Sequence, residues 1–98
     1  MSHEELEAAL VAYIGRGRSP FPTLSSEAVL TRFGSAGSGL LEQVEALVEE
    51  SLRIPIDWNV TTLGDAGRHV ARVLHERHPE LGHDARDALA WNFTYAMR

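Results

Sequence analysis

Residues 84–98 read DARDALAWNFTYAMR, and this stretch decides the fold. On a helical wheel at about 100° per residue, its apolar side chains cover a wide arc with Asn92 near the centre. Only a narrow strip of this helix remains clearly polar, formed by Asp84, Asp87, Thr94 and Arg98. A helix of this kind is either the central element of a small core or part of a contact with another chain.

Four further helical segments precede this helix, and the chain contains no convincing alternating pattern of a β-strand. Cap residues and apolar spacing place the segments at about 2–14, 25–33, 40–53 and 62–78. Ser2 with Glu5, Ser25 (or Thr23), Thr62 with Asp65, and Asp84 are the expected N-terminal caps. The sequence therefore predicts an all-α fold, a small bundle of four to five helices in a single domain of residues 1–98.

The connections between these segments carry further expectations. Residues 34–39, GSAGSG, have the composition of a flexible linker. Residues 54–60 are rich in apolar side chains, which predicts an ordered loop whose Trp58 plugs the core. The short turn 79–83 predicts an antiparallel hairpin of the last two helices, and Gly67 on the inner face allows close helix approach.

Composition excludes several classes of function. The 98 residues contain no cysteine, which rules out disulfides, thiolate zinc sites and a thiol nucleophile. No signal peptide and no membrane span are visible, so we expect a cytoplasmic protein with no membrane contact. All nine basic residues are arginine, and together with the many alanines this indicates codon bias in a GC-rich bacterial genome.

No motif in the chain names a reaction. Serine, histidine and acidic residues occur without the spacing of a nucleophile elbow or a catalytic pair. His75, His78 and His83 allow a three-imidazole site, but His78 is explained more simply by a helix C-terminus that attracts its ring. The sequence thus favours a non-enzymatic role with no metal and no cofactor.

Arg16 and Arg18 follow the first helix and are separated by a glycine, so their guanidinium groups and freed backbone amides could hold a phosphate or a carboxylate. The competing interpretation is that both arginines complement the negative end of the preceding helix. The spacing lacks the length and the lysine of a nucleotide-binding loop.

Two surfaces are candidates for partner binding. Glu42, Glu45 and Glu49 form an acidic stripe on one helix face, and Trp91 with Tyr95 forms an aromatic edge of the kind enriched at interfaces. Because the apolar arc of the last helix is wider than a small core needs, we expect a homodimer through this helix, centred on Trp91, Tyr95 and Met97. Asn92 is expected to satisfy its amide inside the fold, for example on the loop 57–59.

These features predict a module that binds another, unidentified protein, in the manner of an immunity or antitoxin-like inhibitor of a basic partner. The alternative is a helical regulatory module that binds a small ligand or nucleic acid through its Arg and His groups, around Arg68, Arg72 and Arg16. The net charge of −5 argues against nucleic acid unless the basic groups cluster on one surface.

Overall fold

The computed structural model describes residues 3–97. They form five α-helices: α1 (His3–Ile14), α2 (Ser26–Phe33), α3 (Gly37–Leu52), α4 (Leu63–Arg77) and α5 (His83–Met97). A single 3₁₀ turn, η1 (Gly34–Ala36), joins α2 to α3, and no strand occurs in residues 3–97. The all-α prediction is therefore confirmed.

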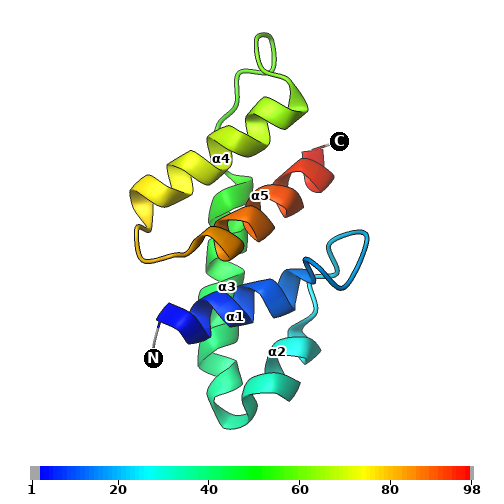
Figure 1. The fold of residues 1–98 in the computed structure, drawn as a ribbon, viewed down its shortest axis with the longest axis vertical. Coiled ribbons are helices and arrows are strands. Elements are labelled where there is room, and N and C mark those ends of the chain that lie inside the picture. Colours follow the sequence, from blue (N-terminus) through cyan, green and yellow to red (C-terminus); the bar gives the residue numbers. More distant parts are fainter. Residues whose placement is uncertain (1–2, 98) are drawn as a thin grey trace.

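Helix α5 is the central element of the fold. It packs between α4 and α1 and also contacts α3, which crosses behind both α1 and α5 (Figure 1). Helix α2 lies against α1 and α3, and α4 with α5 forms the expected hairpin. The shortest extent of the 45 × 27 × 19 Å molecule leaves room for about two layers of helices. Because α5 has neighbours on three sides, its wide apolar arc is largely used within the chain.

The core draws on α5 more broadly than on α4. Phe93 and Leu89 of α5 are almost fully buried and meet side chains from the other helices. The largest of these are Leu10, Ile14, Leu40, Val44, Val70 and Leu74. None of the helices in the described part of the chain is long and apolar enough to cross a membrane.

Local caps set most of the helix ends as predicted. Ser25 Oγ accepts the Ala28 N–H (3.2 Å), and Thr62 Oγ1 accepts the Asp65 N–H (3.2 Å). Gly15 (φ +83°) ends α1 and Gly34 (φ +57°) ends α2, both in a conformation that suits glycine. Of the cap pair Ser2 and Glu5, Ser2 lies outside the described residues.

The start of α5 differs from the prediction. The helix begins at His83, and the Arg86 N–H donates to the Gly82 carbonyl (3.2 Å), so Asp84 lies inside the first turn and is not the cap. Glu7 of α1 supplies the carboxylate instead, because its Oε1 accepts the Ala85 N–H (3.4 Å). A side chain at Gly82 would collide with this carboxylate. An acidic group near a helix N-terminus is favourable, and here it also ties α1 to α5.

Two expectations about the connections are wrong. The stretch 34–39 is not a linker, since η1 leads directly into α3 at Gly37. Gly37 is buried, and a Cβ there would lie 3.1 Å from the Leu30 Cα, so this glycine allows a close contact between α2 and α3. Trp58 does not plug the core: it is 48% exposed and stacks on the outer side of Phe93, with ring centroids 6.4 Å apart.

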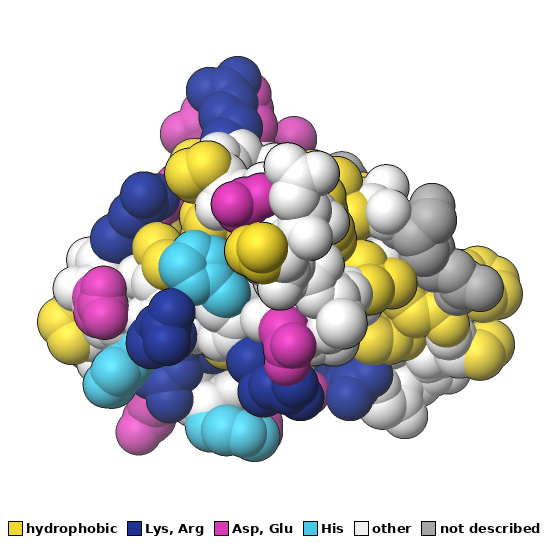
Figure 2. All heavy atoms as spheres, turned by 90° about the horizontal axis from the view of Figure 1, so that it is seen from above, with side chains coloured by type: hydrophobic (Ala, Val, Ile, Leu, Met, Phe, Trp, Pro, Cys, Tyr) yellow, Lys and Arg dark blue, Asp and Glu magenta, His cyan; other side chains and the backbone are white. Residues whose placement is uncertain are grey.

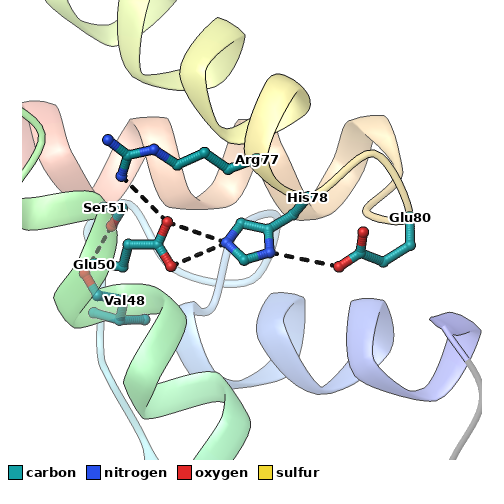
Figure 3. A network of polar contacts seen from close by, with 6 residues as sticks. All are labelled: Val48, Glu50, Ser51, Arg77, His78 and Glu80. Carbon is teal, nitrogen blue, oxygen red and sulfur yellow. Dashed lines mark hydrogen bonds and ion pairs between the residues drawn. The ribbon is translucent and has the colours of Figure 1, made fainter.

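A polar network fastens the C-terminal end of α4 to α3 (Figure 3). The Nε2 atom of His78 lies 2.9 Å from Glu50 Oε1, and Arg77 donates to Glu50 Oε2 (3.3 Å). The other ring nitrogen of His78 lies 3.5 Å from Glu80 Oε1. Burial by itself raises the pKa of Glu50, but hydrogen bonds and positive charge from His78 and Arg77 outweigh it and hold this pKa below its usual value.

This network predicts a pH-dependent loss of stability in Glu50→Gln. A carboxyl group whose pKa is lower in the folded state stabilises the fold above its unfolded pKa of about 4.5, and this contribution disappears as the pH falls through the folded value. We expect Glu50→Gln to lose about 1 kcal/mol at neutral pH, and the difference from wild type to shrink on acidification below pH ~4.5. Urea denaturation at a series of pH values measures both.

Glu49→Gln is the matched control for Glu50→Gln. The Glu49 side chain is 63% exposed, and among residues 3–97 it pairs only with the exposed Arg53. Exposed pairs contribute little, so this variant should stay within a few tenths of a kcal/mol of wild type at every pH. Parallel stability curves for the two variants would show that the His78 network does not stabilise the fold.

Candidate functional site

The connection between α1 and α2 folds back onto α5 and brings three of the predicted site residues together. Arg16 Nε donates to Asp87 Oδ2 (3.0 Å), and its guanidinium carbon lies 4.8 Å from the centre of the Trp91 ring. The Tyr95 hydroxyl donates to the Pro20 carbonyl (2.8 Å). Trp91 and Tyr95 meet edge to face, with centroids 5.4 Å apart. The predicted aromatic edge is therefore partly covered by its own chain.

Arg18 uses its guanidinium differently from Arg16. Its Nη2 donates to the Ala12 carbonyl (2.7 Å), in the last turn of α1, as the helix-end interpretation predicts. Both arginines border an open groove of about 510 Å³ between α1 and α2, whose other charged members are Glu27 and Arg32. Anion binding by Arg16 and Arg18 as a pair stays a prediction.

A second groove, of about 280 Å³, runs between α4 and α5. Much of the groove is lined by small residues, namely Gly64, Gly67, Ala71 and Ala90. The two helices approach closely here, because a Cβ at Gly67 would lie 2.9 Å from the Thr94 Cγ2. This confirms the predicted role of Gly67. The groove is also lined by larger polar, charged and aromatic side chains, those of Arg16, Arg68, His83, Arg86, Asp87 and Trp91.

The arginines of this α4–α5 groove differ in how far they are neutralised. Arg16 pairs with Asp87 and Arg68 pairs with Asp65, whose pKa is lowered by hydrogen bonds from Arg68 and Thr62. Arg86 donates through Nη1 to His75 Nδ1 (2.6 Å) and to the Leu81 carbonyl (2.9 Å). No carboxylate of residues 3–97 forms an ion pair with Arg86. Its positive charge is thus not neutralised locally.

Arginine and histidine side chains gather on the α4 side of the molecule, and hydrophobic side chains gather on the side where α5 ends (Figure 2). Arg68 belongs both to the α4–α5 groove and to a neighbouring groove of about 630 Å³ with His69 and Arg72. Arg72 donates to His69 Nδ1 (2.9 Å). This face therefore joins three of the basic residues considered for the alternative function.

The acidic stripe lies apart from this face. Glu42, Glu45 and Glu49 are exposed on α3 and contribute nothing to the lining of the α4–α5 groove. Glu49 pairs with Arg53, whereas neither Glu42 nor Glu45 forms an ion pair with another described residue. Burial, and then the charge of Glu45, raises the pKa of Tyr13. The stripe is thus a negative surface with few local partners.

The histidines do not form the three-imidazole site. His75 faces Arg86, His78 faces Glu50 and Glu80, and His83 lies 3.5 Å from Asp84. Across the described residues, no group of three His, Asp or Glu side chains is arranged to hold a metal ion. His78 caps α4, but its ring binds carboxylates of α3 and the following turn rather than the helix end.

Arg86 is the site residue that sequence reasoning missed. The small residues Gly67 and Ala71 were the available signal, because small side chains four positions apart on α4 mark where another helix packs closely. Only the antiparallel pairing with α5 then places Arg86 beside them. No protein-family model, curated protein or solved structure matches this chain, so the proposal below rests on its own residues.

Proposed function

We propose that this chain is a non-enzymatic protein-interaction module that binds a basic partner protein through the acidic stripe, as an immunity or antitoxin-like inhibitor does. The observation that carries the proposal is the uneven distribution of charge. Residues 1–50 contain eight acidic and three basic side chains, whereas residues 51–98 contain six of each. The entire net charge of −5 thus belongs to the half of the chain that includes the stripe.

A negative surface of this kind acts mainly on association. Complementary charge speeds diffusional encounter and rejects partners of like charge, and it does so without a large buried area. Glu42 and Glu45 suit this role because they are exposed and form no ion pair with another described residue. A partner can therefore bind these two carboxylates without breaking an ion pair of the described chain.

Affinity capture from the native cell tests this proposal with two charge-matched baits. The first carries Glu42→Gln, Glu45→Gln and Glu49→Gln. The second carries Glu27→Gln, Glu76→Gln and Asp84→Asn, which remove the same formal charge from exposed positions on α2, α4 and α5. We expect wild type and the second bait to retain the same basic protein at low salt, and the first bait to lose it. Equal retention by both baits would exclude the stripe as the binding surface.

We also propose a second copy of the chain as a partner at the end of α5. Phe21 (56% exposed) and Met97 (41% exposed) lie in segments that the Tyr95–Pro20 hydrogen bond joins. A twofold contact would bury both copies of this patch. The patch includes less of Trp91 than the sequence suggests, because Arg16 covers one face of that ring.

Light scattering at micromolar concentration tests self-association. We expect the mass of a dimer for wild type and of a monomer for the double variant Phe21→Glu and Met97→Glu, since buried charge opposes the contact. Val60→Glu is the control, because it places the same charge on the 81%-exposed apolar side chain of another loop. A monomeric wild type would remove the dimer from the proposal.

A further inference from the structure

We infer that the groove between α4 and α5 is a binding site for a small organic anion bearing a carboxylate or phosphate group. This inference goes beyond the proposed protein partner and uses different residues. The groove volume of about 280 Å³ lies just below the roughly 300–1,000 Å³ of typical small-molecule sites, so the groove suits a small ligand. We expect a ligand of a few to about fifteen non-hydrogen atoms to fit a groove of this volume.

Charge selects the class of ligand. Among residues 3–97, the groove lining contains the guanidinium groups of Arg16, Arg68 and Arg86 and one carboxylate, Asp87. Asp65, outside the lining, pairs with Arg68. Guanidinium groups present paired donors that match the oxygens of carboxylates and phosphates. Arg86 is the main anchor, because it is half-buried and, among residues 3–97, only its Nη1 is engaged, by a ring nitrogen and a backbone carbonyl. An anion there would supply the counter-charge that the fold does not.

Arg16 is held in place before any ligand binds. Arg16 donates a hydrogen bond to Asp87, and its guanidinium group lies over the face of the Trp91 ring. Arg68 pairs with Asp65 at the surface, where both side chains are exposed, so it contributes charge rather than a fixed position. Preorganised groups lose little freedom on binding, which favours recognition of a small ligand.

The lining leaves space for the ligand at Gly64. A Cβ built there meets no atom within 4 Å, whereas one at Gly67 would meet Thr94 at 2.9 Å. Gly64 can therefore take a Cβ without a clash, and because Gly64 lines the groove, we expect a larger side chain there to extend into it. A substitution at Gly64 can therefore block the groove without destabilising the fold.

The test is a titration followed by Trp91 fluorescence in a Trp58→Phe background, which leaves Trp91 as the only tryptophan. The probes are inorganic phosphate, benzoate and the uncharged benzamide at constant ionic strength. We expect phosphate or benzoate, or both, to bind at roughly millimolar concentration or below, and benzamide not to bind. Binding of phosphate alone or benzoate alone identifies which of the two anions the groove takes. Failure of both anions to bind would overturn the inference.

Three variants locate the binding. Arg86→Gln should weaken anion binding about tenfold or more, because it removes a charged donor, and Arg53→Gln on the exposed end of α3 should leave it unchanged. Gly64→Leu should abolish binding while the melting temperature stays at or above wild type, since leucine is a better helix former than glycine. Binding that survives Gly64→Leu, or that falls equally in Arg53→Gln and Arg86→Gln, would contradict a site in this groove.

Discussion

Replacing Asn92 by leucine should raise the free energy of unfolding by about 1–3 kcal/mol. Asn92 is 4% exposed, and its Nδ2 has no hydrogen-bond acceptor among residues 3–97. A buried amide without a partner costs free energy that an apolar side chain of similar branching does not. Leucine branches at the same carbon as asparagine and adds apolar contacts next to Phe93 and Leu89, which belong to the core.

Urea denaturation of Asn92→Leu, with Asn92→Asp beside it, measures this effect. The aspartate has nearly the same shape as asparagine but places a charge at a buried position, so it should lower stability at neutral pH. Opposite signs for the two variants are the expected result. A loss of stability in Asn92→Leu would show that the amide satisfies buried backbone groups, as the helical pattern alone suggested.

The helix ends and the buried faces could be read from the sequence because both depend on neighbouring residues. Ser25 and Thr62 cap the helices that follow them, and Gly15 and Gly34 end the helices that precede them. The apolar period of α5 likewise identified Asn92 as buried. The same pattern could not show where the amide nitrogen points, since that depends on the atoms of other helices.

The contacts that shape the candidate site join residues far apart in the chain. Arg16 and Asp87 are 71 positions apart, Pro20 and Tyr95 are 75 apart, and Glu7 reaches the start of α5 across 78. No local pattern predicts such pairs, because they depend on how α1 and α5 are brought side by side.

Two misread segments have the same cause. Glycine-rich composition favours a linker, but Gly37 lets α2 and α3 approach closely and so becomes part of a helix. The size and apolar character of Trp58 favour the core, but Phe93 already fills that place and Trp58 covers it from outside. Tertiary packing decided both outcomes.

The second large effect is expected for the acidic stripe. Neutralising Glu42, Glu45 and Glu49 together should slow association with the captured partner about tenfold or more at low ionic strength. The rate of dissociation should change much less, because rim charges act mainly before contact. Stability should stay close to wild type, since all three side chains are exposed and, among the described residues, only Glu49 has an ion pair to lose.

The measurement that tests the proposed function most directly is the association rate with the captured protein, followed from about 50 mM to about 500 mM salt. Wild type and the triple variant Glu27→Gln, Glu76→Gln and Asp84→Asn should show a steep fall in rate as salt increases. The triple variant of the stripe should be slow at low salt, show a shallow dependence and converge with wild type at high salt. Identical rates and salt dependences for wild type and the stripe variant would contradict binding of a basic partner through Glu42, Glu45 and Glu49.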